Sequence, residues 1–196
     1  MLPVDPLTLE LPTEITTGRL RLRPYRAGDG EMYYRMLQEN REHLYEFLPP
    51  FYLEMRSAED TEARIRELAV EWEKRNLFIF GAWEKASGEY VGECYLANAD
   101  WDVPRIEVGY FTIKAFTGKG YATEMARAML RYAFVHMQVG RVNLQCSADN
   151  QGSRRVAERC GFIFEGRMRQ HHRKKDGTLV DTLWYAMLKS EWEPGA

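Results

Sequence analysis

The chain has 196 residues, of which 45% are hydrophobic and 29% charged, and its formal net charge is −2. This balance is typical of a single globular domain. It argues against a disordered chain and against a general nucleic-acid-binding protein, which usually has a basic excess. The charge is unevenly distributed, because residues 1–100 contain 12 basic and 19 acidic side chains whereas residues 101–196 contain 15 and 10. We therefore expect the two halves to face different partners.

Three cysteines, Cys94, Cys146 and Cys160, are widely spaced along the chain. An odd number at this spacing fits neither a disulfide framework nor a zinc site, so we expect no metal and a reducing compartment. No apolar run approaches the roughly 18 residues of a membrane span. The acidic, proline-containing residues 1–14 are not typical of a signal peptide. The sequence therefore predicts a cytoplasmic protein with no membrane partner and no direct nucleic-acid binding.

The first regular elements are a strand and two helices. Polar and apolar residues alternate from Arg19 to Arg23, which predicts a strand with one buried face. Asp29 is placed to cap a helix over residues 30–48. Ser57 is placed to cap a second helix that runs to about residue 75.

The second part of the chain alternates between strands and helices. Apolar residues at steps of three and four predict an amphipathic helix over residues 122–137. The expected strands span residues 77–83, 90–97, 106–113, 142–146, 162–165 and 179–188, and a short helix spans 151–159. This order predicts a mixed sheet with helices on its faces, of the α/β or α+β class. We expect one domain over residues 15–190, with an extension at 1–14 and a tail at 191–196.

A glycine-rich turn, Thr117-Gly118-Lys119-Gly120-Tyr121, joins the strand over 106–113 to the amphipathic helix. Free backbone N–H groups and the positive end of a helix favour anion binding there, and glycines let a phosphate approach the backbone. A P-loop would need Ser or Thr after Lys119, and a dinucleotide fingerprint would need glycine at position 123. Neither fits, and a plain tight turn remains an alternative.

The turn resembles the acyl-CoA pyrophosphate loop of the GCN5-related N-acetyltransferase superfamily, which reads Gln/Arg-x-x-Gly-x-Gly/Ala. Thr117 replaces the leading residue, while Gly120 and Ala122 match. Residues 150–153 with 158–162 are similar to the second cofactor segment of the superfamily. Residues 19–23 and 107–110 are similar to the subfamily that acetylates the N-terminal alanine or serine of ribosomal proteins. The resemblance covers about residues 15–190 and implies a mostly antiparallel sheet of about seven strands flanked by about four helices.

The resemblance also implies acetyl-CoA as the acetyl donor. The strand end before the turn would pair with the pantetheine arm, and the turn backbone would bind the pyrophosphate. The expected cofactor-binding residues are Phe111, Thr112, Ile113, Thr117, Gly118, Lys119, Gly120, Tyr121, Ala122, Thr123 and Asn150. The alternatives are a solvated loop lysine for Lys119 and a helix cap for Asn150.

Two catalytic residues follow from the same resemblance. Glu107 matches the glutamate of the family's central strand and is the candidate general base. Ser153 lies where ribosomal-protein acetyltransferases place a serine near the thioester sulfur, and it is the candidate proton donor to the leaving thiolate. Many relatives have a tyrosine four residues later, where this chain has Ala157. The alternatives are a surface-facing strand residue for Glu107 and a helix-start serine for Ser153.

Direct attack on a thioester requires a neutral amine. At pH 7 about a tenth of an α-amino group is neutral, against about 0.04% of a lysine side chain. A carboxylate base, acting directly or through a water molecule, would suffice for an α-amine. The subfamily resemblance implies that the acceptor is the α-amino group of a protein N-terminus, such as that of a ribosomal protein. The alternatives are a small amine, such as an aminoglycoside, polyamine or amino acid, and a non-catalytic CoA-binding module.

An aromatic segment separates the first two expected helices, where the family has the wall of its acceptor site. The candidate acceptor-binding residues there are Tyr45, Phe47, Phe51 and Tyr52. A hydrophobic clamp between helices is the alternative interpretation. Because relatives are often monomers or dimers, we expect a monomer or a homodimer.

Overall fold

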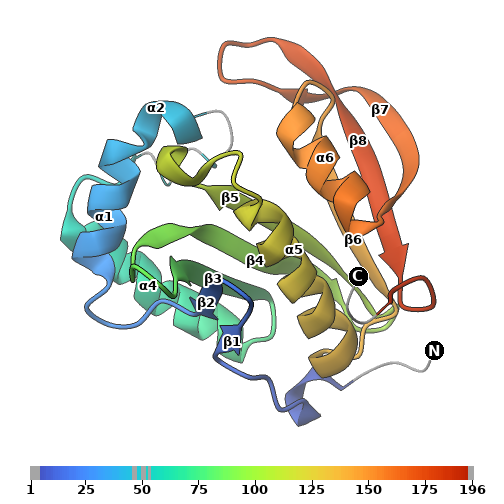
Figure 1. Cartoon of the computed structure of the whole chain (residues 1–196), viewed down its shortest axis with the longest axis horizontal. Coiled ribbons are helices and arrows are strands. Elements are labelled where there is room, and N and C mark those ends of the chain that lie inside the picture. The colour runs from blue at the N-terminus through green and yellow to red at the C-terminus, as the bar shows by residue number, and fades with distance from the viewer. Residues whose placement is uncertain (1–4, 46–47, 50–51, 53, 194–196) are drawn as a thin grey trace.

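Figure 1 shows the computed structural model of the chain, which describes residues 5–45, 48–49, 52 and 54–193. Its centre is one eight-stranded sheet with the strand order β1-β2-β3-β4-β5-β6-β8-β7. The strands are β1 (Ile15–Thr16), β2 (Leu20–Arg23), β3 (Leu77–Glu84), β4 (Tyr90–Asp100), β5 (Arg105–Thr112), β6 (Arg141–Ser147), β7 (Ile163–Arg173) and β8 (Leu179–Leu188). Neighbouring strands are antiparallel except β5 and β6, which are parallel. The mixed, mostly antiparallel sheet is confirmed.

Five α-helices are found in the described part of the chain, and they cover both faces of the sheet (Figure 1). They are α1 (Gly30–Glu39), α2 (Arg41–Leu44), α4 (Ala58–Glu73), α5 (Tyr121–Arg131) and α6 (Gln151–Cys160). Helices α1 and α4 pack together, with α4 against β3, whereas α5 packs on β4 and β5 and α6 on α5 and β6. None of these helices is long and apolar enough to cross a membrane.

Alternation along β3 divides the core between the two faces. Phe78 and Phe80 pack into the cluster that contains α5, whereas Ile79 belongs to the cluster that contains α1. The buried face of α5 is mostly apolar, and Met125 and Met129 on it are completely buried. Two-sided burial explains why a central strand reads as a nearly continuous apolar segment.

The helix predicted over residues 30–48 is wrong in length, because α1 ends at Glu39. Asn40 ends it: its side-chain amide donates to the Met36 carbonyl at 3.0 Å, and its side-chain oxygen accepts from the Lys114 N–H at 3.0 Å. Asparagine competes in this way with the helical hydrogen bonds of the backbone. The short α2 follows as a separate element, tied by Asn40 to the segment after β5.

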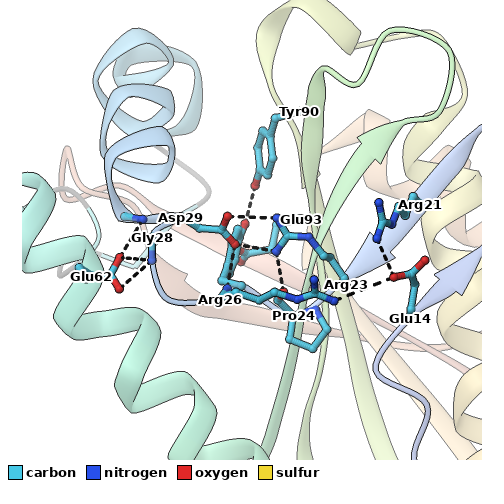
Figure 2. Close-up of polar contacts among 12 residues, drawn as sticks. Glu14, Arg21, Arg23, Pro24, Arg26, Gly28, Asp29, Glu62, Tyr90 and Glu93 are labelled. Carbon is cyan, nitrogen blue, oxygen red and sulfur yellow. Dashed lines mark hydrogen bonds and ion pairs between the residues drawn. The ribbon is translucent and has the colours of Figure 1, made fainter.

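Asp29 is the N-cap residue of α1, as predicted, but its side chain makes no capping hydrogen bond. Its carboxylate binds the Arg23 guanidinium at 2.6 and 3.0 Å and the Arg26 N–H at 2.8 Å (Figure 2). Glu62 of α4 instead accepts from the N–H groups of Gly28 and Gly30 at the start of α1. An ion pair to the neighbouring strand therefore competes successfully with a local cap. The cap predicted at Ser57 is confirmed, with its hydroxyl accepting from the Asp60 N–H at 3.3 Å.

The second half follows the expected order with two differences in length. The amphipathic helix ends as a π-helical turn over Tyr132–His136, so the segment predicted as one helix comprises two conformations. Strand β7 runs to Arg173, well beyond the predicted end at residue 165. It is an exposed edge strand, so its residues show no alternation of buried and exposed positions.

Candidate active site

A groove of about 310 Å³ lies where the end of β5, the start of α5 and one face of α6 meet. Nine of the eleven expected cofactor-binding residues line it: Phe111, Thr112, Thr117, Gly118, Gly120, Tyr121, Ala122, Thr123 and Asn150. Ile113 and Lys119 do not. The Lys119 side chain lies over the Phe116 ring at 5.0 Å, and its carbonyl accepts from Arg19 at 3.0 Å.

The glycine turn exposes the N-terminal end of α5. Gly118 and Gly120 have φ angles of 78° and 83°, in the left-handed region that favours glycine. Gly120 is the N-cap residue of α5 and brings no side chain to cap the helix. The first N–H groups of the helix are therefore available to an anion, at the positive end of the helix dipole.

Arg19, at the entrance to β2, holds this turn in place. Its guanidinium lies 4.0 Å from the centre of the Tyr121 ring and pairs with Glu124 at 2.7 Å. The Glu124 carboxylate also accepts from the Arg19 N–H at 2.8 Å and from the Thr17 hydroxyl at 2.5 Å. The N-terminal strand thus braces the first turn of α5, a role that the alternating pattern of residues 19–23 does not reveal.

Helix α6 adds basic side chains that the sequence interpretation missed. Arg155 and Arg159 both line the groove. They are four residues apart and so share one face of the helix. The four-residue spacing of the two arginines could have revealed this basic face from the sequence. Their guanidinium groups add positive charge to the groove that also contains the start of α5.

His43 of α2 also lines the groove. Its Nε2 atom lies 3.0 Å from the Thr112 carbonyl and 3.5 Å from the Thr117 hydroxyl. The imidazole therefore connects α2 to both ends of the segment between β5 and the glycine turn. Nothing in the sequence marked this histidine, because the contact spans 69 residues.

The parallel strands β5 and β6 separate partway along their length. Their ladder comprises Arg105 with Arg141, Ile106 with Val142 and Glu107 with Asn143. Beyond it β5 continues to Thr112 and β6 to Ser147 without pairing to each other. A cavity of about 660 Å³ opens at the separation, and both Glu107 and Ser153 line it.

Glu107 is the last β5 residue of the ladder, at the mouth of the separation. Its carboxylate accepts from the Gln145 amide at 2.8 Å and from the Asn98 amide at 3.4 Å. The ion pairs of the described residues do not include Glu107. The two neutral amides therefore orient the carboxylate without neutralising its charge. Within the described residues no cation pairs with it, and a carboxylate that stays charged and accessible can accept a proton.

Ser153 lies in the first turn of α6, where Asn150 caps the helix by accepting from the Ser153 N–H at 3.0 Å. The capping alternative for Asn150 is therefore confirmed, although Asn150 also lines the groove. The Ser153 hydroxyl lies 3.1 Å from the phenol oxygen of Tyr110. Burial raises the pKa of Tyr110, so the phenol keeps its proton at neutral pH.

Tyr110 of β5 thus places a phenol beside Ser153, whereas the helix position at which the family resemblance would predict a tyrosine is Ala157. Ala157, which stands at that helix position, is fully buried. Tyr110 borders the groove and the cavity at the strand separation alike. Its position next to Ser153 could not be read from spacing, because the two residues are 43 positions apart.

Of the four residues predicted to line the acceptor site, the structure describes two, Tyr45 and Tyr52. Phe47 and Phe51 lie outside the described residues. Tyr52 is 5% exposed and its ring meets the Tyr33 ring edge-on at 6.3 Å, so it belongs to the core between α1 and the sheet. Tyr45 is exposed, and its ring lies 4.1 Å from the ammonium of Lys175 at the tip of the β7–β8 hairpin. Lys175 also donates to the Tyr45 carbonyl, so the hairpin tip reaches the end of α2.

The described residues hold no cluster of three or more metal-ligating His, Cys, Asp or Glu side chains. All three cysteines are free and buried.

Comparison with known proteins identifies the family. Residues 19–163 match the model of the acetyltransferase (GNAT) domain. The chain belongs to the GNAT family. It is therefore an acetyl-CoA-dependent N-acetyltransferase.

The matches to individual relatives cover most of this chain and most of each relative. The Bacillus subtilis (strain 168) protein named "Putative ribosomal N-acetyltransferase YdaF" is 31% identical over 182 residues, covering 89% of this chain and 93% of YdaF. A crystal structure described as that of a "Probable acetyltransferase" superposes with a TM-score of 0.83 at 27% identity, covering 91% and 98% of the two chains. A RimL ribosomal L7/L12 α-N-protein acetyltransferase in complex with coenzyme A superposes with a TM-score of 0.80 at 20% identity over 91% and 97%, which shows the fold.

Proposed function

We propose that this GNAT enzyme acetylates the α-amino group of a protein N-terminus, such as that of a ribosomal protein, in the cytoplasm. Glu107 at the mouth of the strand separation, in one cavity with Ser153, carries the proposal. The two side chains belong to different walls of that cavity, so an amine and a thioester could meet between them. The names of YdaF and RimL point to the same class of acceptor. We assign the catalytic domain to residues 15–190, acting as a monomer or homodimer.

The groove fits the phosphates of acetyl-CoA. The uncapped start of α5 offers backbone donors, and Arg155 and Arg159 offer positive charge close by. Gly120 adopts a φ of 83°, which favours glycine, and without a side chain it leaves the backbone at the helix end accessible. We assign the backbone of residues 119–122 to the pyrophosphate.

The remainder of the acetyl donor would follow β5. Beyond Glu107 this strand has an edge that β6 leaves unpaired, which suits an extended pantetheine arm along Phe111, Thr112 and Ile113. Asn150 would contact the same arm through a group not used in capping Ser153. Acetyl-CoA supplies the acetyl group as a reactive thioester.

Glu107 then accepts a proton from the acceptor ammonium, directly or through a water molecule. The amine lone pair forms the new C–N bond, the C–S bond of the thioester breaks, and the nitrogen loses its second proton to water. Ser153 donates its hydroxyl proton to the departing sulfur and regains one from Tyr110, whose phenol lies 3.1 Å away and is reprotonated from solvent. An α-amino group needs only modest assistance, because about a tenth of it is already neutral at pH 7. Holding the reactants together supplies much of the acceleration.

Turnover of acetyl-CoA by a panel of acceptors tests the proposal. The panel contains peptides with varied first residues, the same peptides blocked at the α-amine, and small amines of the aminoglycoside, polyamine and amino-acid classes. We expect turnover with free peptides and none with blocked ones. Turnover with small amines alone would overturn the N-terminal acceptor and leave the acetyltransferase chemistry in place.

A further inference from the structure

A second, smaller cavity of about 200 Å³ lies on the face of the sheet that α1 and α4 cover. It shares Tyr95 and Tyr110 with the cavity at the strand separation, and Phe111 with the acetyl-CoA groove. Its walls are mostly apolar or aromatic and include Ile79 and Tyr52. The cavity therefore begins next to the proposed site of acetyl transfer and leads away from it into the core.

One acidic residue, Glu93 of β4, lines this cavity. Its side chain faces the same side of the sheet as Glu107, because Glu93 pairs with Phe111 and Glu107 pairs with Ala97 in the same antiparallel ladder. Tyr95 lies between them along β4, with its ring packed over Gly109, where a Cβ atom would lie 2.0 Å from the ring. The two carboxylates thus flank Tyr95 on one face.

The hydrogen bonds of Glu93 involve one of its two oxygens. Oε2 accepts from the Tyr25 hydroxyl at 2.9 Å and from the Tyr33 hydroxyl at 3.0 Å, and the Tyr90 hydroxyl lies 2.7 Å from that of Tyr25. Figure 2 shows Tyr90 and Glu93 in this network. Within the described residues no donor reaches Oε1, although Glu93 is only 2% exposed. A buried carboxylate is costly unless its charge is balanced.

The charges around Glu93 include one cation of the chain, which forms no ion pair with it within the described residues. Arg64 also lines the cavity, but its guanidinium binds Glu67 at 3.0 Å and lies over the Tyr52 ring at 5.9 Å. The ion pairs recorded among the described residues do not include Glu93. Burial raises the pKa of Glu93 to about 7, opposed by hydrogen bonds from Tyr25 and Tyr33 and by attraction to Arg64. A bound cation would favour the ionised form further.

We propose that this cavity is a cation subsite for the acceptor, in which Glu93 binds an ammonium or guanidinium group on a short aliphatic stem. The apolar walls suit the stem, and Glu93 Oε1 with the neighbouring tyrosine rings suits the charge. The cation belongs to the same molecule as the amine that is acetylated, so the inference rests on the proposed function. Acceptors with a second positive charge near the reactive amine are then preferred.

Paired acceptors that differ by one charge test the subsite. They are 1,4-diaminobutane against 1-aminobutane, and a lysine-first peptide against the matching norleucine-first peptide. We expect kcat/KM of the wild-type enzyme to favour the cationic member at least about tenfold. Glu93→Gln, which keeps an oxygen for Tyr25 and Tyr33, should remove that preference. Glu73→Gln, an exposed change on α4, is the charge-matched control and should leave the preference unchanged.

Titration of the CoA-saturated protein with the two butylamines measures the same subsite by calorimetry and without reaction. Tighter binding of the diamine in the wild type supports the subsite even if no amine is acetylated, which would overturn the proposed function alone. Turnover of both amines with equal constants and equal affinities would overturn the subsite alone.

Glu93→Asp provides a second variant if Glu93→Gln does not fold. Aspartate retains the negative charge, but its side chain is one methylene shorter, so the carboxylate lies farther from the bound cation. The preferred diamine should therefore become the longer 1,5-diaminopentane. An unchanged preference for 1,4-diaminobutane in Glu93→Asp would contradict a contact between Glu93 and the cation.

Discussion

The groove that we assign to acetyl-CoA and the cavity that we assign to the acceptor are built in different ways. The groove is formed mainly by backbone: a glycine turn with two left-handed residues, the uncapped end of α5 and the free edge of β5. The proposed acceptor side is lined by side chains from α4, β3, β4 and β5, and the β7–β8 hairpin tip contacts the end of α2 through Lys175. Backbone recognition requires a fixed local conformation, whereas side-chain recognition allows the pocket to be changed residue by residue.

This difference predicts separate consequences for substitutions on the two sides. A change in the groove should act on the acetyl donor, whatever the acceptor is. A change on the acceptor side should act on proton transfer or acceptor choice and leave the binding of acetyl-CoA nearly intact. The following variants test that separation.

Gly120→Asp should have the largest effect, on the acetyl donor alone. A side chain at a φ of 83° strains the backbone by about 1–2 kcal/mol, and a carboxylate at the helix end repels phosphate. We expect kcat/KM for acetyl-CoA to fall by about a thousandfold. Gly88→Asp, at a φ of 75° in the β3–β4 turn, is the matched control and should change it little. Equal effects of the two variants would show that strain alone is measured.

Stability as a function of pH tests the buried carboxylate on the acceptor side. Burial raises the pKa of Glu93 from 4.5 to about 7, so the folded protein binds more protons than the unfolded chain between these values. The contribution of Glu93 to the free energy of unfolding is therefore complete below pH 4.5 and is lost as the pH rises through 7, by about 3 kcal/mol. Urea unfolding at pH 5 and pH 7.5 should show a smaller pH dependence in Glu93→Gln than in the wild type. The same pH dependence in both proteins would contradict an ionisation of Glu93 in this range.

Glu107→Gln should lower kcat by about a hundredfold, because glutamine keeps the shape but cannot accept a proton. The remaining rate should follow the fraction of acceptor that is already neutral and so rise with pH. Rates measured from pH 6 to 9, with Glu89→Gln in an exposed turn as the control, provide the comparison. A pH profile identical to that of the wild type would remove Glu107 as the base.

Ser153→Ala should have a smaller effect, about tenfold on kcat, because Tyr110 remains nearby to donate a proton. The Ser153 N–H that Asn150 caps is unaffected by this change, so the helix should remain intact. Tyr110→Phe and the double variant complete a cycle, in which the effects should be less than additive. Additive effects in thiol-release assays would indicate that the two hydroxyls act independently.

The sequence predicted those parts of the fold and the groove that depend on local pattern. The glycine turn, the amphipathic stripe of α5 and the strand β8 needed no distant contact to be recognised. The C-terminal end of α1 was predicted wrongly because Asn40 bonds to the distant Lys114. The start of α1 was predicted correctly, but the carboxylate of Asp29 pairs with Arg23 and does not cap the helix. The end of the edge strand β7 was predicted too early, because its exposed residues do not alternate between buried and exposed positions, and strand prediction depends on that alternation.

The same reasoning explains what was missed at the candidate site. Tyr110 meets Ser153 because β5 and the start of α6 come together, a tertiary fact that no spacing along the chain contains. Glu93 reads as one polar residue in an apolar strand, and its burial depends on tyrosines 68 and 60 positions away. Most of the cofactor-binding residues predicted by family pattern line the groove, whereas the residue that we propose to select the acceptor is brought to its cavity by packing.

Acetylation of one peptide with a single α-amine and a single lysine tests the central claim most directly. Both amines then meet the same enzyme at the same concentration, and the neutral fraction at pH 7 favours the α-amine by a factor of roughly 250. We predict that mass-spectrometric mapping after partial turnover finds acetyl groups on the α-amine in large excess over the lysine. Acetylation mainly on the lysine side chain, or in equal amounts at both positions, would contradict the account.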